Sequence, residues 1–398
     1  MRITANLFSS YIGEENRIYE QFCGIRDADL NRKNGIILYD FFAVAGGAER
    51  LTLLLAQTLR NVDLCVGYLV KDAISDQELK GLSCYYLTSQ CDSPGWRSIK
   101  LSRAFRRRTE FLSRYEWVLY SGTVAPLAVK NHQQGLNLLY CHTIPRFAYD
   151  LERYYTKVLS GWKVPFFKAL VVYTRKYYET AISKMDTIIV NSENVRKRLK
   201  TYIGLDSRVI HPPCETEKYQ WLGQGGYYLS TARLENFKRV EIIIRAFRKM
   251  PDRKLIVTSG GSEENRLRGL AQGAPNIIFT GWTSEKDLAG LMGNAIASIY
   301  IPIDEDFGMS PVESMAAGKP VIGVREGGLL ETVADGQTGF LIPPNPSEEE
   351  LIEAVQKMGP KTALEMRNAC EVRARQFDKS IFIKKIFALL ESFEGLKF

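Results

Sequence analysis

The segment from Ile301 to Gly323 restricts the possible folds of this chain more than any other. It begins at the end of an apolar strand (297–303), passes through an acidic loop, and continues into a helix expected to open near Ser310 and Pro311, before a second strand at 320–324. Ser310 suits the N-cap of a helix, and Pro311 suits its first turn, where the missing N–H of proline is not needed. Strand, loop, helix and strand in this order are typical of α/β domains.

The loop and helix start combine groups that bind sugars and phosphates. Two carboxylates flank the turn, Glu305 in the loop and Glu313 in the first helical turn, while Gly308 allows close approach of the backbone. Unpaired N–H groups at a helix start can receive an anion. The carboxylates can bind sugar hydroxyls, and the backbone N–H groups beside them can bind phosphate. Together they predict a nucleotide-sugar site. The alternative is an ordinary turn with surface acids.

Alternating strand and helix patterns cover most of the chain. This alternation predicts parallel sheets with helices on both faces, and a length of 398 residues indicates two domains. We expect a first domain over 34–215 and a second over 225–379, joined by the polar, Gly-rich linker 215–226. Residues 1–33 are predicted to be an extension with a short helix around 15–22. Strands are expected within 35–44, 64–69, 117–121, 136–141, 185–193, 208–214, 254–261 and 276–283.

Composition narrows the class of protein. The chain has no apolar run of transmembrane length, no signal-peptide core at its N-terminus and no Cys-x-x-Cys pair. These features predict a cytoplasmic protein without structural zinc. Residues 1–220 hold 31 Lys and Arg against 22 Asp and Glu, a net +9, whereas 221–398 hold 22 against 23, a net −1. The basic first half indicates an anionic partner.

Two segments of the first half suit a peripheral contact with the inner face of an anionic membrane. Residues 97–115 combine seven cations with apolar residues on one helical side, and 151–180 interleave Tyr, Trp and Phe with Lys and Arg. The alternatives are a core-packed helix with a solvated basic face and a helical hairpin packed on its domain. Nucleic acid is not an expected partner, because no nucleic-acid motif accompanies the charge.

The spacing Glu305-x7-Glu313, followed by Ala-Ala-Gly-Lys-Pro-Val, closely resembles the signature of retaining glycosyltransferases of family 4 with the GT-B fold. The string 46–50, with Gly46 and Gly47, is similar to the first glycine loop of that family, and 326–332 and 335–343 are similar to its trailing glycine turns. The resemblance spans roughly residues 35 to 395. It implies two Rossmann-like domains facing across a cleft, with the residues 380–398 packing back on the first domain through a crossing C-terminal helix.

The resemblance also implies roles for single residues. Arg233 and Lys238 would hold the donor diphosphate, since fixed cations stabilise the negative charge of a departing nucleoside diphosphate. Glu305 would bind the hydroxyls of the donor sugar and Glu313 the ribose, and His142, at a strand end, would contact the donor sugar or phosphate. The expected catalytic residues are therefore Glu305, His142, Arg233 and Lys238. Backbone groups of Phe307, Gly308, Met309 and Ser310 would receive the phosphate, and those of Gly281, Trp282 and Thr283 would read the base.

The reaction implied is a retaining, metal-independent transfer of a hexose on the front face of the donor. Asp304-Glu305-Asp306 is a literal Asp-x-Asp, the metal motif of another glycosyltransferase fold, yet Arg233 and Lys238 already supply cations, so we expect neither metal nor cofactor. Many relatives carry Gly where this chain has Arg239.

Residues 142–150 and 238–240 resemble the mannosyltransferase-like branch of the family, which favours GDP-mannose as the donor. The expected acceptor is a saccharide or a polyprenyl-diphosphate-linked saccharide in polysaccharide assembly. Alternatives are a UDP-sugar donor, an epimerase or hydrolase, and a non-catalytic nucleotide-sugar-binding subunit.

Overall fold

The computed structural model describes residues 34–43, 46–71 and 73–393. The predicted extension 1–33, with its helix around 15–22, lies outside these ranges. The chain divides into two compact units. The first contains the described residues up to Asn191, Val195–Ile210 and the residues from Ile386 onward, and the second contains Ser192–Asn194 and His211–Lys385. Residues 215–226, expected as a linker, lie within the second unit.

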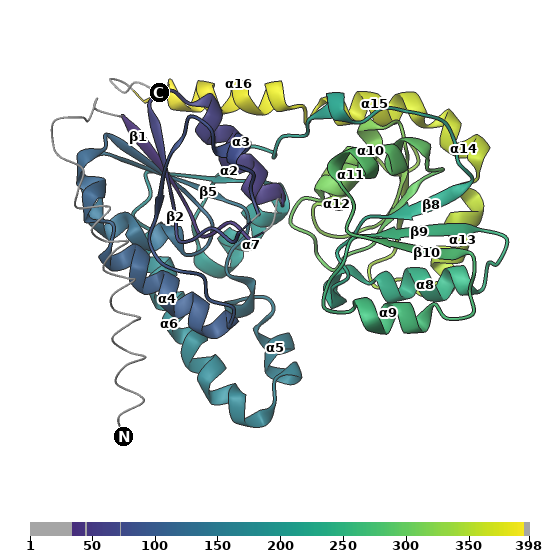
Figure 1. Ribbon diagram of the computed structural model, residues 1–398, viewed down its shortest axis with the longest axis horizontal. Helices are drawn as coiled ribbons and strands as arrows, with labels where there is room; N and C mark the ends of the chain where they lie inside the picture. The colour runs from purple at the N-terminus through teal and green to yellow at the C-terminus, as the bar shows by residue number, and fades with distance from the viewer. Residues whose placement is uncertain (1–33, 44–45, 72, 394–398) are drawn as a thin grey trace. The chain divides into compact units, whose positions relative to one another are not determined.

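The first unit is built on a seven-stranded parallel sheet with the strand order β3-β2-β1-β4-β5-β6-β7 (Figure 1). Every residue of β1, β2 and β4 is buried, as expected for a parallel sheet with both faces covered. The strands are β1 Gly35–Tyr39, β2 Val62–Val66, β3 Ser83–Tyr86, β4 Trp117–Ser121, β5 Leu136–Cys141, β6 Thr187–Val190 and β7 Arg208–Val209.

Helices and short 3-10 turns connect these strands. The helices are α2 Gly47–Thr58, α3 Asp76–Leu79, α4 Pro94–Arg107, α5 Glu152–Val158, α6 Val164–Ile182 and α7 Glu193–Ile203. The 3-10 turns are η1 Glu110–Arg114, η2 Ala125–Asn131, η3 Arg146–Ala148 and η4 Gly161–Lys163. Of the apolar residues in segment 97–115, Leu101, Phe105 and Leu112 are buried. The core-packed alternative therefore describes this segment better than lipid contact does.

The first strand is shorter than its apolar run suggested. It was expected to reach residue 44, but β1 ends at Tyr39 because Asp40 turns the chain. The buried Asp40 carboxylate accepts hydrogen bonds from the backbone N–H groups of Thr123, Val124 and Ala125 at 2.7–2.8 Å. Burial raises the pKa of Asp40 and these bonds oppose that rise.

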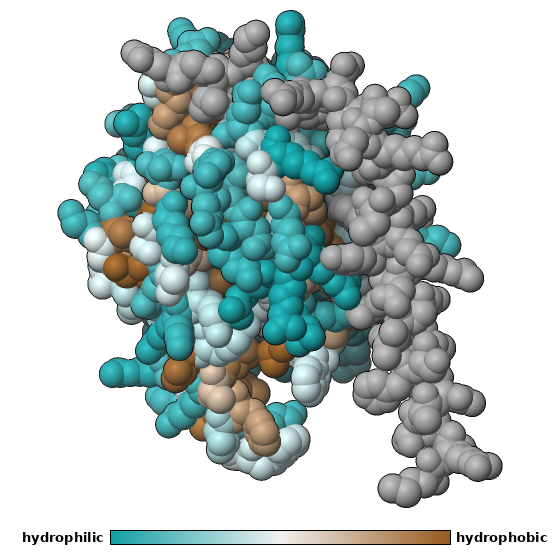
Figure 2. All heavy atoms as spheres, turned by 90° about the vertical axis from the view of Figure 1, so that its left-hand side faces the viewer, coloured by the Kyte–Doolittle hydropathy of each residue, from teal (hydrophilic) through white to brown (hydrophobic). Residues whose placement is uncertain are grey.

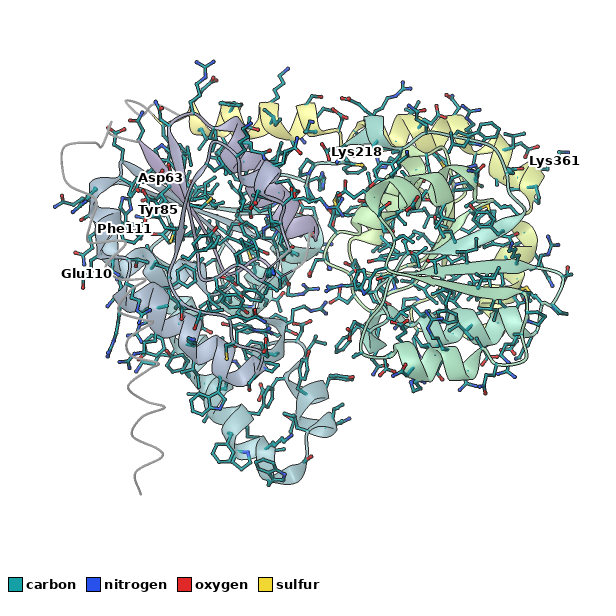
Figure 3. The ribbon with its side chains drawn as sticks, in the orientation of Figure 1. Asp63, Tyr85, Glu110, Phe111, Lys218 and Lys361 are labelled. Carbon is teal, nitrogen blue, oxygen red and sulfur yellow. The ribbon has the colours of Figure 1, made fainter. Side chains whose placement is uncertain are left out.

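A second polar cluster lies inside the first unit, where neighbouring strands β2 and β3 carry Asp63 and Tyr85 (Figure 3). The Asp63 carboxylate accepts hydrogen bonds from the hydroxyls of Tyr115, at 2.7 Å, and Tyr85, at 3.4 Å. Asp63 is only 1% exposed, and a buried polar side chain of this kind needs hydrogen-bond partners. The cluster is structural, since it holds η1 against the sheet edge.

The second unit is built on a six-stranded parallel sheet with the order β10-β9-β8-β11-β12-β13. Its strands are β8 Tyr227–Ser230, β9 Lys254–Thr258, β10 Ile277–Gly281, β11 Ser298–Tyr300, β12 Val321–Val324 and β13 Gly339–Ile342. Its helices are α8 Val240–Arg248, α9 Glu264–Leu270, α10 Glu285–Asn294, α11 Met309–Ala316, α12 Leu329–Thr332, α13 Glu348–Lys357, α14 Pro360–Glu365 and α15 Arg367–Arg375, with 3-10 turns η5 Thr216–Lys218 and η6 Asn236–Lys238.

The last helix, α16 Lys379–Leu390, is shared between the units. Its residues from Ile386 onward belong to the first unit, and Ile386, Leu389 and Leu390 are buried. Among the described residues, no helix combines the length and the apolar character needed to cross a membrane.

Candidate active site

The strand order of the second sheet reverses between β8 and β11. From β8 the chain proceeds outward to β9 and β10, and then crosses to β11 on the other side of β8. The loops that follow β8 and β11 therefore leave neighbouring strands at the same sheet edge. Ligands of open α/β sheets bind at such a switch point, outside the carboxyl ends of the strands. Both loops carry predicted site residues, Arg233 and Lys238 after β8 and Glu305 after β11.

Lys238, Glu305 and Tyr300 are mutually hydrogen-bonded at this switch point. The Lys238 ammonium lies 2.5 Å from Glu305 Oε2 and 3.1 Å from the Tyr300 hydroxyl, which in turn donates to Glu305 Oε2 at 3.1 Å. Lys238 comes from η6, Tyr300 is the last residue of β11, and Glu305 lies in the loop beyond it. We call these three residues the Lys–Tyr–Glu triad.

The electrostatics of the triad favour a charged lysine. Burial acts to lower the pKa of Lys238, but the neighbouring Tyr300 and Glu305 more than offset it, so the pKa is raised above its usual range. Burial raises the pKa of Tyr300, and the charge of Glu305 raises it further. At neutral pH the site thus holds a lysine cation and a neutral phenol that donates a hydrogen bond.

Backbone contacts also join the two loops. The N–H of Ile303 donates to the carbonyl of Phe237 at 2.8 Å, and the hydroxyl of Thr231, just after β8, is hydrogen-bonded to that of Ser310. Two loops tied at several points can hold their side chains in a fixed geometry without a ligand, which lowers the cost of ligand binding.

A glycine turn supports the acidic loop from behind. A Cβ on Gly327 would lie 2.6 Å from the carbonyl oxygen of Glu305, and one on Gly328 would lie 2.4 Å from the Cα of Phe307. The N–H of Gly328 donates to the carbonyl of Glu305 at 2.8 Å. Only residues without a side chain allow this close approach.

Arg239 occupies a left-handed conformation, with φ +52°. An L side chain is strained in this conformation, which glycine adopts more readily. The Arg239 guanidinium lies 2.6 Å from Glu326 Oε1, next to the glycine turn. This ion pair needs a charged side chain at position 239.

The start of α11 differs from the prediction. Gly308, with φ +91°, occupies the N-cap, and Met309 is the first helical residue. The expected cap, Ser310, is wrong, because its hydroxyl bonds Thr231 and it lies one residue inside the helix. The side chain of Phe307 is buried against His211 and Phe377, so this residue offers the site only its backbone.

The other predicted donor-binding residues lie around the same sheet edge. Arg233, in the loop after β8, is exposed, and within the described ranges its guanidinium has no ion-pair partner. Glu313 is 9% exposed within α11. Gly281 is the last residue of β10 and has φ +70°. Trp282 is 67% exposed, and its indole lies so close to Gly260 that a Cβ on Gly260 would be 2.5 Å from the indole Nε1.

His142, Gly46 and Gly47 belong to the first unit. The His142 Nε2 lies 2.9 Å from the hydroxyl of Ser121, and its carbonyl accepts a hydrogen bond from the Asn191 amide at 2.8 Å. Burial lowers the pKa of His142 to about 4, so the imidazole is neutral at pH 7. Gly46 is the N-cap of α2 in an extended conformation, and Gly47 is its first residue.

Sequence reasoning missed two residues, Tyr300 and Thr231. Tyr300 falls in the apolar run 297–303 that is expected as a strand, and no role is predicted for Thr231. One available signal was position, since Tyr300 is the last residue of β11 and Thr231 is the first residue after β8. Among the described residues, no three His, Cys, Asp or Glu side chains are grouped in a way that could hold a metal ion.

Comparison with known proteins agrees with this fold. Residues 215–377 match the family model described as glycosyl transferases group 1, and this range contains the whole Lys–Tyr–Glu triad. An α-1,3/1,6-mannosyltransferase, ALG2, of Dictyostelium discoideum is 33% identical over 156 residues, which are 33% of this chain and 37% of that protein. A D-inositol 3-phosphate glycosyltransferase of Mycobacterium marinum is 29% identical over 188 residues, 41% of this chain and 40% of that protein. The chain thus spans less than half the length of these two relatives.

Solved structures share the fold. Anabaena Alr3699/HepE in complex with UDP and glucose superposes with a TM-score of 0.70 at 16% identity, covering 91% of this chain and 100% of that one. WaaG, a glycosyltransferase involved in lipopolysaccharide biosynthesis, gives a TM-score of 0.70 at 14% identity, covering 88% of this chain and 98% of that one. The predicted GT-B fold is confirmed. The family match covers residues 215–377, and this part of the chain is similar to the glycosyl transferases group 1.

Proposed function

We propose that this protein is a retaining glycosyltransferase that moves a hexose from a nucleotide diphosphate sugar to a saccharide acceptor. The observation that carries the proposal is the Lys–Tyr–Glu triad at the switch point of the second sheet, inside the region that matches the family. A cation held there can meet the diphosphate, and a carboxylate beside it can meet the sugar hydroxyls.

In this mechanism Lys238 and Arg233 stabilise the departing nucleoside diphosphate. The bond between the anomeric carbon and the diphosphate oxygen breaks, and a bond from that carbon to the acceptor oxygen forms on the same face. The proton of the acceptor hydroxyl passes to the departing phosphate. Fixed cations near the leaving oxygen stabilise the charge that develops in the transition state. Glu305 orients the donor sugar, Glu313 binds the ribose, and backbone groups of 307–310 receive the phosphate.

Mannose from GDP-mannose is the proposed sugar, and a polyprenyl-diphosphate-linked saccharide is the proposed acceptor. The likeness to a mannosyltransferase supports the donor. The second candidate is a UDP-sugar, which the UDP complex of the structural neighbour supports. The Trp282 indole and the backbone of Gly281–Thr283 are proposed to meet the nucleobase.

A thermal-shift panel is the first test. We expect GDP-mannose to raise the melting temperature more than UDP-glucose or UDP-galactose, with transfer then measured using the best binder. A larger shift with a UDP-sugar would select the second candidate. Breakdown or isomerisation of the donor without an acceptor would instead indicate a hydrolase or epimerase. Activity that requires added Mg²⁺ or Mn²⁺ would contradict the metal-independent mechanism.

The substitution Lys238→Ala tests the mechanism itself. We expect turnover to fall by a factor of about 100 or more, since the variant removes a charge that stabilises the leaving group. Lys361→Ala is the matched control, because Lys361 is exposed on α14 of the same unit (Figure 3) and should leave turnover unchanged. Near-normal turnover in the folded Lys238→Ala variant would refute the assignment.

A further inference from the structure

The hairpin formed by α5, η4 and α6 is anchored at its base. Arg175 Nε donates to the carbonyl of Ala148 at 2.6 Å, and its guanidinium lies 2.6 Å from Glu152. The Tyr149 hydroxyl donates to Glu179 at 3.0 Å. The base is thus part of the folded first unit, and the hairpin extends from it (Figure 1).

The far end of the hairpin exposes large apolar side chains. Val158 is 64% exposed, Trp162 is 70% exposed and Phe166 is 73% exposed, and the three come from the end of α5, the turn η4 and the first turn of α6. We call Val158, Trp162 and Phe166 the apolar tip. Brown and white spheres gather at this lower end of the molecule in Figure 2. Apolar groups gathered at one exposed place mark an interaction surface.

The inner side of the same hairpin is packed in the ordinary way. The rings of Tyr155 and Phe167 have centroids 6.1 Å apart, and Phe167 also contacts Phe147 at 6.4 Å. Neither of these two ring pairs includes a residue of the apolar tip. The packed-hairpin alternative accounts for these inner residues and leaves the tip without a structural role.

The charge around the tip is of one sign. Between Glu152 and Glu179 the chain has no acidic residue, while it carries six cations. Lys157, Lys163 and Lys168 are exposed, and no described carboxylate forms an ion pair with them. The Lys163 ammonium lies 5.3 Å from the centre of the Trp162 ring, which leaves the indole and the cation on the same end.

We propose that the apolar tip and its surrounding lysines insert into the headgroup region of an anionic lipid bilayer. Trp and Phe suit the boundary between headgroups and acyl chains, and lysine stems can bury while their ammonium groups remain at the phosphates. The absence of acids along 26 residues favours a negatively charged surface over a typical protein partner, whose charges are mixed. The proposal is independent of the sugar-transfer function.

Vesicle sedimentation with the full chain tests this binding. We expect the protein to bind phosphatidylcholine vesicles that contain about one third phosphatidylglycerol at least tenfold better than vesicles of phosphatidylcholine alone. The preference should disappear at ~1 M salt, where the Debye length is about 3 Å. Equal binding to both kinds of vesicle, or none to either, would overturn the proposal.

Two variants separate the apolar and charged contributions. The double substitution Trp162→Ser with Phe166→Ser should weaken binding at least tenfold, and Lys157→Glu with Lys163→Glu should abolish the preference for anionic vesicles. Trp96→Ser is the matched control, because Trp96 is 69% exposed on α4 of the same unit, and it should bind as the wild type does. Equal loss in the control would contradict the assignment to the hairpin.

Tryptophan fluorescence gives an independent readout. Emission should shift to shorter wavelength when anionic vesicles are added, and Trp162→Phe should remove this shift while binding persists, since phenylalanine is still apolar. A circular dichroism melt of each variant confirms that it is folded, which is expected because the substituted side chains are exposed. Association of copies in ultracentrifugation without vesicle binding would show that another chain covers the tip, and would refute lipid contact.

Discussion

At the scale of single residues, the candidate site depends on a small number of hydrogen bonds to one carboxylate oxygen. Glu305 Oε2 accepts from both the Lys238 ammonium and the Tyr300 hydroxyl. A lysine alone would hold the carboxylate by charge, whereas the added phenol fixes its orientation. Tyr300 is therefore proposed as a positioning residue for the two groups expected to meet the donor.

The substitution Tyr300→Phe isolates this positioning role. It removes one hydroxyl and leaves the ring. We expect turnover to fall about tenfold, because the loss of about 1.4 kcal/mol of hydrogen bonding lowers a rate by that factor. Tyr228→Phe is the control, since its hydroxyl donates to the carbonyls of Val355 and Met358 inside the second unit. It should lower the midpoint of urea denaturation without changing turnover. Equal turnover in wild type and Tyr300→Phe would rule out the positioning role.

His142 is expected to titrate near pH 4. Burial lowers its pKa to about 4, against about 6.5 in an unfolded chain. Nuclear magnetic resonance can follow the imidazole, because the chain has three histidines and His142→Gln identifies the missing signal. A His142 signal that titrates near pH 6.5 would show that the imidazole is solvated.

The same shift predicts a loss of stability in acid. As pH falls below about 6.5 the unfolded state takes up the proton first, so the free energy of unfolding decreases until about pH 4 and then levels off. The decrease is up to about 3 kcal/mol from this group alone. Urea denaturation of wild type and His142→Gln across this range isolates it from the carboxylates. Parallel curves for the two proteins would contradict the prediction.

At the scale of elements, the sequence predicted whether a segment is a helix or a strand better than it predicted the residue at which each element begins or ends. Apolar runs between helical patterns gave the parallel strands, and β4 and β5 have the predicted bounds. β1 ended early because Asp40 bonds a loop 83 to 85 residues away, a contact that no local pattern contains. The cap of α11 was misassigned because Ser310 bonds Thr231, and only the packing of the two loops shows this.

The glycine turn at 327–328 gives a prediction at this scale. Gly328→Ala should destabilise the protein by about 1–3 kcal/mol and disturb the acidic loop, since its Cβ would lie 2.4 Å from the Cα of Phe307. Gly269→Ala is the control, because Gly269 lies in α9 with nothing within 4 Å of its Cβ, and it should stabilise by about 0.5–1 kcal/mol. Thermal denaturation measures both, and a neutral Gly328→Ala would show that the loop can move aside.

At the scale of the whole molecule, the chain has two sheets with separate cores. Composition and length predicted two α/β domains, and the resemblance at 301–323 pointed to the correct fold. The strand order could not be derived from the sequence, because each order buries the same apolar runs. The position of Tyr300 at the switch point therefore became apparent only in the structure.

Because the two units have separate cores, we expect nucleotide binding to stabilise the second unit and not the first. Calorimetry should show that a nucleoside diphosphate shifts the melting of the second unit and leaves that of the first unchanged. At a concentration of 100 times Kd the stabilisation would be about 2.7 kcal/mol. Lys238→Ala should abolish the shift at the same concentration, and Lys361→Ala should retain it. Equal movement of all transitions would show that the two units unfold together.

The split membership of α16 has a consequence for biosynthesis. All seven strands of the first sheet have been synthesised by residue 209, yet the residues from Ile386 that complete this unit follow only after the second unit has been translated. At about 5–20 residues per second, the nascent first sheet waits roughly 10–35 seconds with the surface for Leu389 and Leu390 uncovered. Production of this chain should therefore depend on chaperones that shield such surfaces until translation reaches α16.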